Sequence, residues 1–378
     1  MNASDILFSL LRYEINGEEI SENTKKCIDN DMLLNLYELS CAHDLSHLVS
    51  DALSKIGVEI SKELRQQKVL SIFRSESISL HLKSIKETLS KGEIPFIPLK
   101  GAVIREYYPE EWMRTSSDID ILVKEEDLDK AIELFEKEKW QADKKNFHDI
   151  CLYKKGSAPL ELHFSIKENM EKLDRVLDKV WENVTLKEDF EYELSNEFLL
   201  FHLLAHIAYH FIRGGCGIRT VLDVWLIKEK LKIDEKVLKN LCQEAQIEVF
   251  ADRITELSRV WFEGKTHTDI TKKMEEFILF GGLYGNYENR ASVEQTVAGG
   301  RKKNLLSRII MPYDKMVIRY PVLKKHKLLT PLFHIARWGS TLKKGTLRRV
   351  TAEYNAGNKN SEAKIAKTQE LLNKIGLI

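Results

Sequence analysis

The sequence lacks the cysteine spacing of a disulfide framework or of a cysteine zinc site. Its five cysteines are an odd number, and no two of them form a C-x-x-C pair. Disulfide scaffolds and cysteine zinc sites need paired cysteines at short, repeated spacings. We therefore expect neither in this protein. The cysteines are Cys27, Cys41, Cys151, Cys216 and Cys242.

Long apolar runs are also missing from the sequence. No stretch approaches the roughly 20 uninterrupted apolar residues that a membrane-spanning helix requires. The first residues, MNASDILFSLLRYEINGEE, contain no basic leader and no long apolar segment, so we expect no signal peptide. Together with the cysteine usage, these absences predict a cytoplasmic protein without a transmembrane segment.

The chain has no overall excess of positive or negative charge, because 58 Lys and Arg balance 58 Asp and Glu. The distribution is uneven, since residues 301–350 contain 14 Lys or Arg and a single acid, Asp314. Such a basic stretch suggests RNA, an anionic membrane surface or an acidic face of the same chain as its partner. A solvated basic surface is the ordinary alternative.

Hydrophobic residues make up 43% of the chain, enough to bury sizeable cores in two or three compact units. Apolar residues repeat at helical spacing before and after a central segment in which short strands alternate with helices. A polar segment with glycines, 285–304, is expected to be a mobile loop. The expected regions are N-terminal helices 1–92, an α/β core 93–170, a helical domain 171–290 and a basic C-terminal helical region 291–378.

The pattern in the α/β core predicts the order strand, helix, strand, helix and two further strands. The last two strands are separated by Gly156 and Ser157, a pair typical of a hairpin turn. This order predicts a small mixed sheet and an α+β fold. The strands are expected at 94–101, 118–123, 148–155 and 158–166, with the longer helix at 125–140.

Two carboxylates alternate along the strand DIDILV. Asp118 and Asp120 are two residues apart, so both side chains project from the same face of the sheet. The intervening residues Ile119, Ile121 and Val123 project from the other face and would anchor the strand in the core. Two acids on one face can share a pair of hard cations. A solvated strand edge is the alternative explanation.

A turn with glycine precedes this strand by one element. In Leu99-Lys100-Gly101-Ala102, a strand ends and a helix begins. Free backbone N–H groups at a helix start bind phosphate, and glycine lets the phosphate approach closely. Lys100 could add a positive charge there. An ordinary strand-to-helix turn is the alternative, but a phosphate-binding turn beside an acidic pair is more specific than either feature alone.

A third acid follows on a later strand. Glu161 and His163 project from one face of this strand, while Leu160, Leu162 and Phe164 project from the other. If this strand lies beside DIDILV, Glu161 completes a site of three carboxylates. The alternative is an acid that simply faces solvent.

This combination resembles the DNA polymerase beta-like nucleotidyltransferase superfamily. More narrowly, the chain resembles a bacterial family of uncharacterised nucleotidyltransferases, and the resemblance extends through FHLLAH and VLDVW into the helical flanks. It implies a small mixed-sheet nucleotidyltransferase core between N-terminal and C-terminal helical regions. The motifs that carry it are Leu99-Lys100-Gly101, Tyr108-Pro109, Arg114 before Asp118-Ile119-Asp120-Ile121-Leu122-Val123, and Glu161-Leu162-His163.

The resemblance implies transfer of a nucleotidyl group from an NTP, with ATP the first choice, to a hydroxyl group, with release of pyrophosphate. It implies two Mg²⁺ ions, with Mn²⁺ as an alternative, held by Asp118, Asp120 and Glu161. One departure is Ala102, where the wider superfamily usually has Ser; another is a long gap between Gly101 and Asp118. The residues expected to contact the nucleotide are Lys100, Gly101, Ala102, Arg114 and Ser117.

Histidines recur every four residues at 202, 206 and 210, which places them along one helix face. Zinc is a weak hypothesis, because the Glu of an H-E-x-x-H motif is missing. Core histidines with polar partners are the simpler explanation. An intermediate hypothesis is an acceptor pocket, whose candidate residues are His163, His206, His210, Arg219 and Asp223.

Three functional hypotheses remain open on the sequence alone. The first is a nucleotidyltransferase acting on a small molecule. The second is the same chemistry on RNA or protein, as in toxin-like relatives of the superfamily, with the basic stretch holding the target. The third is a module that binds a nucleotide without turnover. The sequence does not identify the acceptor.

Overall fold

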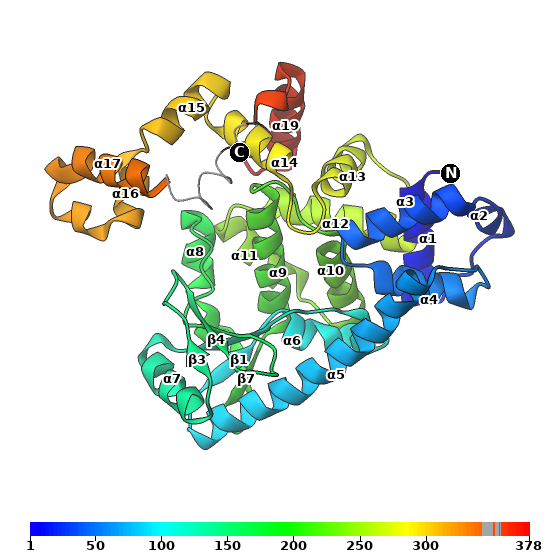
Figure 1. Ribbon diagram of the computed structural model, residues 1–378, viewed down its shortest axis with the longest axis horizontal. Helices are drawn as coiled ribbons and strands as arrows, with labels where there is room; N and C mark the ends of the chain where they lie inside the picture. The colour runs from blue at the N-terminus through cyan, green and yellow to red at the C-terminus, as the bar shows by residue number, and fades with distance from the viewer. Residues whose placement is uncertain (342–350, 352–354, 356) are drawn as a thin grey trace. The chain divides into compact units, whose positions relative to one another are not determined.

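The computed structural model describes residues 1–341, 351, 355 and 357–378 (Figure 1). These residues form two compact units. The first unit consists of Met1–Tyr209 and Gly217–Thr271, and the second of His210–Cys216 and Lys272–Ile378. The first unit contains the mixed sheet and the second is built from helices, so the α+β fold class is confirmed.

The N-terminal region is helical, as predicted. Polar side chains cap several of these helices: Asn2, Ser21, Asp29 and Ser61 each accept a hydrogen bond from an amide in the first turn. The last helix, α5, ends before Gly92. The helices are α1 (Ala3–Asn16), α2 (Glu22–Lys26), α3 (Asn30–Ala42), α4 (Ser46–Lys55) and α5 (Lys62–Lys91).

The sheet has seven strands in the order β3-β4-β5-β2-β1-β7-β6. Its centre is mixed, because β2 pairs antiparallel with β1 and parallel with β5. β4 pairs antiparallel with β5 through the hairpin at Gly156, whose φ is +82°. The strands are β1 (Phe96–Pro98), β2 (Ile119–Val123), β3 (Gln141–Ala142), β4 (Asp149–Tyr153), β5 (Leu160–His163), β6 (Val184–Glu188) and β7 (Glu191–Leu194).

One face of the sheet forms the apolar core with α5 and α7 (Leu128–Lys137). In Figure 1, α5 runs diagonally below and to the right of the strands, and α7 lies at their lower left. The sheet contributes the alternate residues of each central strand, which leaves the residues between them on the opposite face. The core members from β2, β4 and β5 are Ile119, Ile121, Val123, Ile150, Leu152, Leu160 and Leu162.

The region after residue 170 was expected to be wholly helical, and this expectation is wrong for 184–194. These residues form the hairpin β6–β7, which turns at Asp189 with a φ of +46°. β7 pairs with β1, and the amide of Phe96 donates to the carbonyl of Phe190. Most residues of the two strands are at least partly exposed. An edge hairpin of this kind lacks the apolar periodicity that identifies a buried strand.

The remaining elements of the first unit are short turns around the sheet and a group of longer helices. Those before β6 are α6 (Gly101–Ile104), α8 (Glu171–Leu177) and the 3-10 turns η1 (Arg105–Tyr107), η2 (Glu111–Met113), η3 (Glu125–Asp127) and η4 (Val180–Glu182). Those after β7 are α9 (Asn196–Phe211), α10 (Ile218–Lys230), α11 (Glu235–Glu244) and α12 (Glu248–Glu263).

The second unit contains a helix where a mobile loop was expected. Within 285–304, α14 begins at Tyr287, with the Asn286 side chain accepting from the amide of Asn289. The hydroxyl groups of Ser292 and Thr368 lie 2.7 Å apart, so α14 packs on α19 through polar groups. A helix buried in this way has no apolar stripe in its sequence. The helices are α13 (Asp269–Gly281), α14 (Tyr287–Val297), α15 (Arg301–Ile309), α16 (Tyr313–Arg319), α17 (Thr330–Thr341) and α19 (Glu362–Lys374), with the 3-10 turns η5 (Pro321–Lys324) and η6 (Lys327–Leu329).

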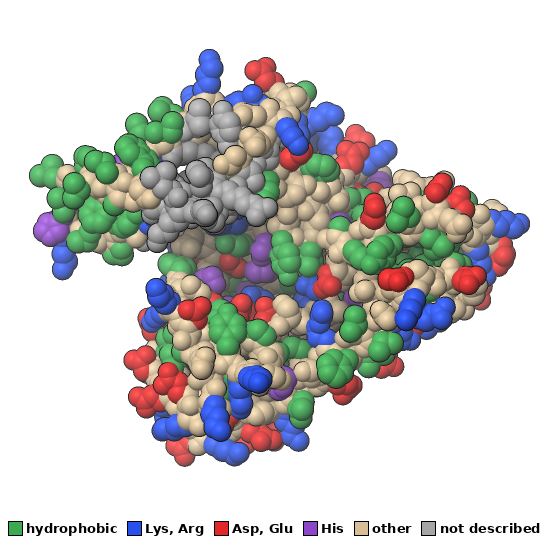
Figure 2. Space-filling view, in the orientation of Figure 1, with side chains coloured by type: hydrophobic (Ala, Val, Ile, Leu, Met, Phe, Trp, Pro, Cys, Tyr) green, Lys and Arg blue, Asp and Glu red, His purple; other side chains and the backbone are tan. Residues whose placement is uncertain are grey.

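The charged surface differs between the two units. Figure 2 shows acidic and basic side chains interspersed around α7. The basic stretch 301–350 belongs to the second unit and runs through α15, α16 and α17, while its last part, 342–350, lies outside the described residues. No helix in the described part of the chain is long and apolar enough to cross a membrane.

Candidate active site

The acidic residues of β2 and β5 meet on the sheet face opposite the apolar core. Asp120 is the register partner of Glu161 in the parallel pairing of these strands. Asp118 comes directly before β2, in the same alternation as Asp120. His163 follows Glu161 by two residues and shares this face. The adjacency on which the three-carboxylate hypothesis depends is therefore present.

Asp120 is 5% exposed and has two close nitrogen partners. Its Oδ1 accepts hydrogen bonds from Lys100 Nζ at 3.1 Å and from His163 Nε2 at 2.8 Å. Burial by itself would raise the pKa of this carboxyl group. The Lys100 charge and the His163 hydrogen bond outweigh burial and hold the pKa of Asp120 well below its usual range. Burial by itself would lower the pKa of Lys100, but the negative charge of Asp120 raises it.

His163 connects the two acids. It is 3% exposed, and its Nε2 also lies 3.6 Å from Glu161 Oε2. Burial would lower the pKa of His163, but the hydrogen bonds to Asp120 and Glu161 raise it. The donor atoms of Asp120, Glu161 and His163 lie within 4.8 Å of one another, so this group could hold a metal ion.

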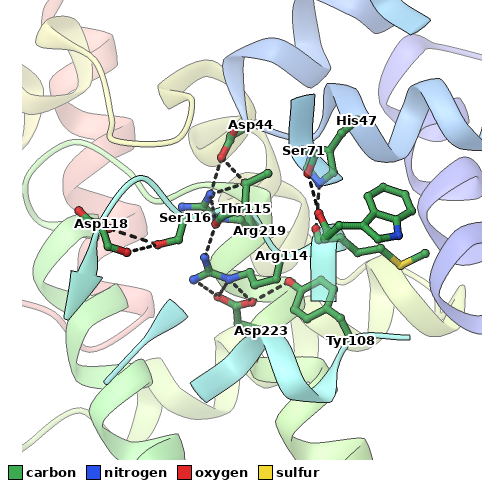
Figure 3. Close-up of polar contacts among 12 residues, drawn as sticks. Asp44, His47, Ser71, Tyr108, Arg114, Thr115, Ser116, Asp118, Arg219 and Asp223 are labelled. Atoms are coloured by element: carbon green, nitrogen blue, oxygen red, sulfur yellow. Dashed lines mark hydrogen bonds and ion pairs between the residues drawn. The ribbon is translucent and has the colours of Figure 1, made fainter. Parts of the chain in front are cut away.

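Asp118 stands at the edge of the same cluster. The Ser116 hydroxyl donates to its carbonyl oxygen at 2.9 Å and to its Oδ1 at 3.2 Å, as Figure 3 shows. Burial, followed by the negative charges of Asp120 and Glu161, raises the pKa of Asp118. The three carboxylates therefore repel one another despite the nearby Lys100, and bound cations would relieve this repulsion.

The turn before the site differs from the expected phosphate cradle. The amides of residues 102–104 donate to the carbonyls of Leu99 and Lys100, and helix α6 is a single turn. Ala102 is 5% exposed and its side chain belongs to the apolar core. A Ser hydroxyl at this position would therefore enter the apolar core. The Lys100 side chain reaches the carboxylates from this turn.

Gly101 is required by a close approach of two segments. A Cβ atom at this position would lie 2.9 Å from the Ser116 hydroxyl and 3.2 Å from Ser116 Cβ. The turn that carries Lys100 and the loop that leads to Asp118 are thereby in direct contact. Ser117, the next residue of that loop, is exposed.

Arg114 has a different partner from the one predicted. It is 7% exposed and forms a double hydrogen bond with Asp223 of α10, which is fully buried (Figure 3). Tyr108 donates a third hydrogen bond to Asp223, at 2.6 Å. The guanidinium group is thus used to hold the loop 108–118 in place. Because Asp223 is enclosed, it does not line an acceptor pocket, and this prediction is corrected.

The same loop is fastened at three further points by helices of the first unit. Arg219 of α10 donates to the carbonyl and hydroxyl oxygens of Thr115 and also pairs with Asp44 (Figure 3). His47 of α4 contacts the carbonyl of Met113 at 2.8 Å, and Ser71 of α5 donates to that of Trp112 at 2.6 Å. Arg219 therefore supports the loop. The roles of Asp44, in the turn between α3 and α4, and of His47 and Ser71 were not predicted, because isolated polar residues in or between amphipathic helices carry no sequence signal.

Two histidines of α9, His202 and His206, lie close enough to the site for its charges to shift their pKa values. Burial first, and then positive neighbours that include Lys100, lower the pKa values of His202 and His206 to about 3. His206 Nδ1 is 2.7 Å from Glu168 Oε1. Neither histidine joins a metal-binding group among the described residues. His210 belongs to the second unit, where its carbonyl accepts from the amides of Arg213 and Gly215.

Comparison with known proteins identifies one family. A family model described as "Uncharacterised nucleotidyltransferase" matches residues 31–263, which is more than half of the chain. The matched range includes the sheet, the acidic cluster and the helices that fasten the loop 108–118. No curated protein and no solved structure matches significantly.

Replacing Asp223 with Ala should destabilise the protein by about 3–5 kcal/mol, because it leaves the buried Arg114 charge without its partner. Urea unfolding followed by circular dichroism measures this change. Asp252→Ala, at an exposed position of α12, is the matched control. The double variant Arg114→Met/Asp223→Leu should recover part of the stability. Wild-type stability in Asp223→Ala would contradict this account.

Stability should also fall as the pH drops from 7 to 5. The unfolded chain protonates His202 near its ordinary pKa of 6.5, whereas the folded protein does not until about pH 3, so acid favours the unfolded state within this window. His202→Gln should reduce the loss of unfolding free energy between pH 7 and 5 by about 1–2 kcal/mol. Urea unfolding at both pH values tests this, with the exposed His326→Gln as the control. Equal losses in wild type and His202→Gln would count against it.

Proposed function

The chain belongs to the family of uncharacterised nucleotidyltransferases, and we propose that it transfers a nucleotidyl group from an NTP to a hydroxyl group of a small molecule. The observation that carries this proposal is the meeting of Asp118, Asp120 and Glu161 on one sheet face, with Lys100 beside them. In the reaction, the acceptor hydroxyl group gives its proton to solvent and its oxygen bonds to the α-phosphorus. The bond between the α-phosphorus and the oxygen that bridges to the β-phosphate breaks, and pyrophosphate leaves.

The donor set fits divalent cations. Two strands supply carboxylate oxygens at a position where burial and mutual repulsion raise the pKa of Asp118. Hard cations such as Mg²⁺ and Mn²⁺ prefer such oxygen ligands. We propose that Asp118, Asp120 and Glu161 hold these ions. When bound, they would neutralise the triphosphate and make the acceptor hydroxyl group more acidic.

Lys100 lies where it can leave the Asp120 carboxylate and contact a phosphate group when the NTP binds. Its ammonium group is 3.1 Å from Asp120 Oδ1, and its side chain is 27% exposed. A triphosphate that approaches this face would meet Lys100 and the exposed Ser117 of the adjoining loop. We propose that Lys100 moves from the carboxylate to a phosphate oxygen of the NTP, because phosphate carries more charge.

The other polar groups position this machinery. His163 holds the Asp120 carboxylate through the 2.8 Å hydrogen bond to Oδ1. The Arg114–Asp223 ion pair holds the loop that ends at Asp118. Both groups are at least 93% buried, and we propose that they orient the acids. Electrostatic catalysis depends on this kind of fixed orientation.

The decisive experiment is a screen for label transfer. Purified protein is incubated with α-labelled NTPs, divalent ions and a metabolite extract, and pyrophosphate release is measured in parallel. We expect labelled small molecules with wild type and a loss of at least about two orders of magnitude with Asp120→Asn or Asp118→Asn, because each loses a charge that stabilises the transition state. Asp129→Asn, on the exposed side of α7, is the control.

The products of this screen also separate the alternatives. Label on RNA or protein would replace the small-molecule acceptor with a macromolecule. Tight NTP binding without pyrophosphate release under any condition would indicate a binding module. Full turnover in Asp120→Asn would refute the carboxylate assignment.

Lys100→Met should raise the KM for the NTP by at least about tenfold, since one charge-assisted hydrogen bond to phosphate is worth roughly 1.5–3 kcal/mol. Lys100→Arg should retain part of the affinity, because it keeps the charge. Steady-state kinetics and NTP titration calorimetry measure both variants. An unchanged KM and an unchanged dissociation constant in Lys100→Met would rule out the phosphate contact.

A further inference from the structure

The polar face of the sheet extends beyond the proposed nucleotide site onto a third strand. β4 pairs antiparallel with β5, so that Cys151 is the register partner of Glu161 and Asp149 that of His163. Register partners project from the same face, while Ile150 and Leu152 of β4 enter the apolar core. Donor atoms of Asp149, Cys151 and Glu161 all lie within 4.8 Å of one another.

Asp149 is a buried carboxylate with unusually weak partners. It is 6% exposed, and the side-chain donors that lie close to it in the described structure are the Cys151 thiol at 3.7 Å and His148 Nε2 at 3.9 Å. A carboxylate removed from water normally has charged or strong hydrogen-bond partners, because its desolvation is costly. A cation between Asp149, Cys151 and Glu161 would give this carboxylate a close charged partner.

An orphaned nitrogen lies on the same face. His163 Nδ1 is buried and has no hydrogen-bond partner among the described residues, although His163 is 3% exposed and is the register partner of Asp149. The His148 ring stacks on His163, with centroids 5.6 Å apart and planes 8° apart. His148 Nδ1 is also buried without a partner in the described structure. Unsatisfied buried polar atoms point to an ion or ligand that completes the site.

We propose that Asp149, Cys151 and Glu161 form a second metal site, which binds a thiophilic divalent cation such as Zn²⁺. This site goes beyond the proposed transfer reaction and does not depend on it. Binding removes the thiol proton, which passes to solvent, and forms a bond between the Cys151 sulfur and the cation. Glu161 is shared with the nucleotide site, so the two sites adjoin through one carboxylate.

The donor chemistry decides the class of cation. Mg²⁺ and Ca²⁺ favour oxygen ligands alone, whereas a thiolate favours Zn²⁺ and Co²⁺. A dication deprotonates the thiol that it binds. His148 Nε2 lies 3.9 Å from Asp149 Oδ1, beside this group of three but not a member of it.

Cobalt spectroscopy tests the site directly. Co²⁺ is titrated into the full-length protein without NTP, and the thiolate-to-cobalt charge-transfer band in the near ultraviolet is recorded. We expect a saturable band in wild type, no band in Cys151→Ser and at least about a tenfold higher Co²⁺ dissociation constant in Asp149→Asn. The band should persist in Cys41→Ser, which removes an exposed thiol.

Variants of the nucleotide site separate this proposal from the transfer reaction. Asp120→Asn should keep the cobalt band, whatever its effect on label transfer. A wild-type protein without the band, or a band that remains in Cys151→Ser, overturns the metal site. Loss of the band in Asp120→Asn overturns the separation into two sites. Circular dichroism establishes that each variant is folded, and the near-isosteric Cys151→Ser is the least disruptive change.

Discussion

The parallel pairing of β2 with β5 is the constraint on which the candidate site depends. It places Asp120 opposite Glu161 and leaves the alternating isoleucines and leucines in the core on the other side. A slip of one residue would turn the acids into the core and the apolar residues outward. The burial of one face therefore fixes the carboxylates of the other face, and the repulsion between them is a direct consequence of folding.

Polar contacts with the surrounding helices hold the loop that leads into β2. The buried pair Arg114–Asp223 joins this loop to α10, while Asp44, His47 and Ser71 fasten it to the N-terminal helices. Ion pairs of this kind contribute little net stability, but each is costly to break once its partner is buried. The helical flanks thus determine the position of Asp118, although they contribute no carboxylate to the cluster on the sheet.

The polar face is wider than a site of three acids. Glu161 lies between Asp120 on one neighbouring strand and Cys151 on the other. His163 contacts Asp120 through a hydrogen bond and is the register partner of Asp149. The cysteine spacing argued against a cysteine zinc site because that rule considers only pairs of cysteines along the chain. A mixed set of ligands on adjacent strands arises from strand register and leaves no such spacing.

The sequence by itself determined the local features: the α/β core, the hairpin at Gly156, the alternation in β2 and the resemblance that places the chain in its family. These follow from periodicity and turn chemistry over a few neighbouring residues. Only the tertiary structure decided the partner of Arg114, the burial of Asp223 and the closeness of Cys151 to Glu161. Such contacts join residues distant in the sequence, and their energies depend on burial, which no local pattern encodes.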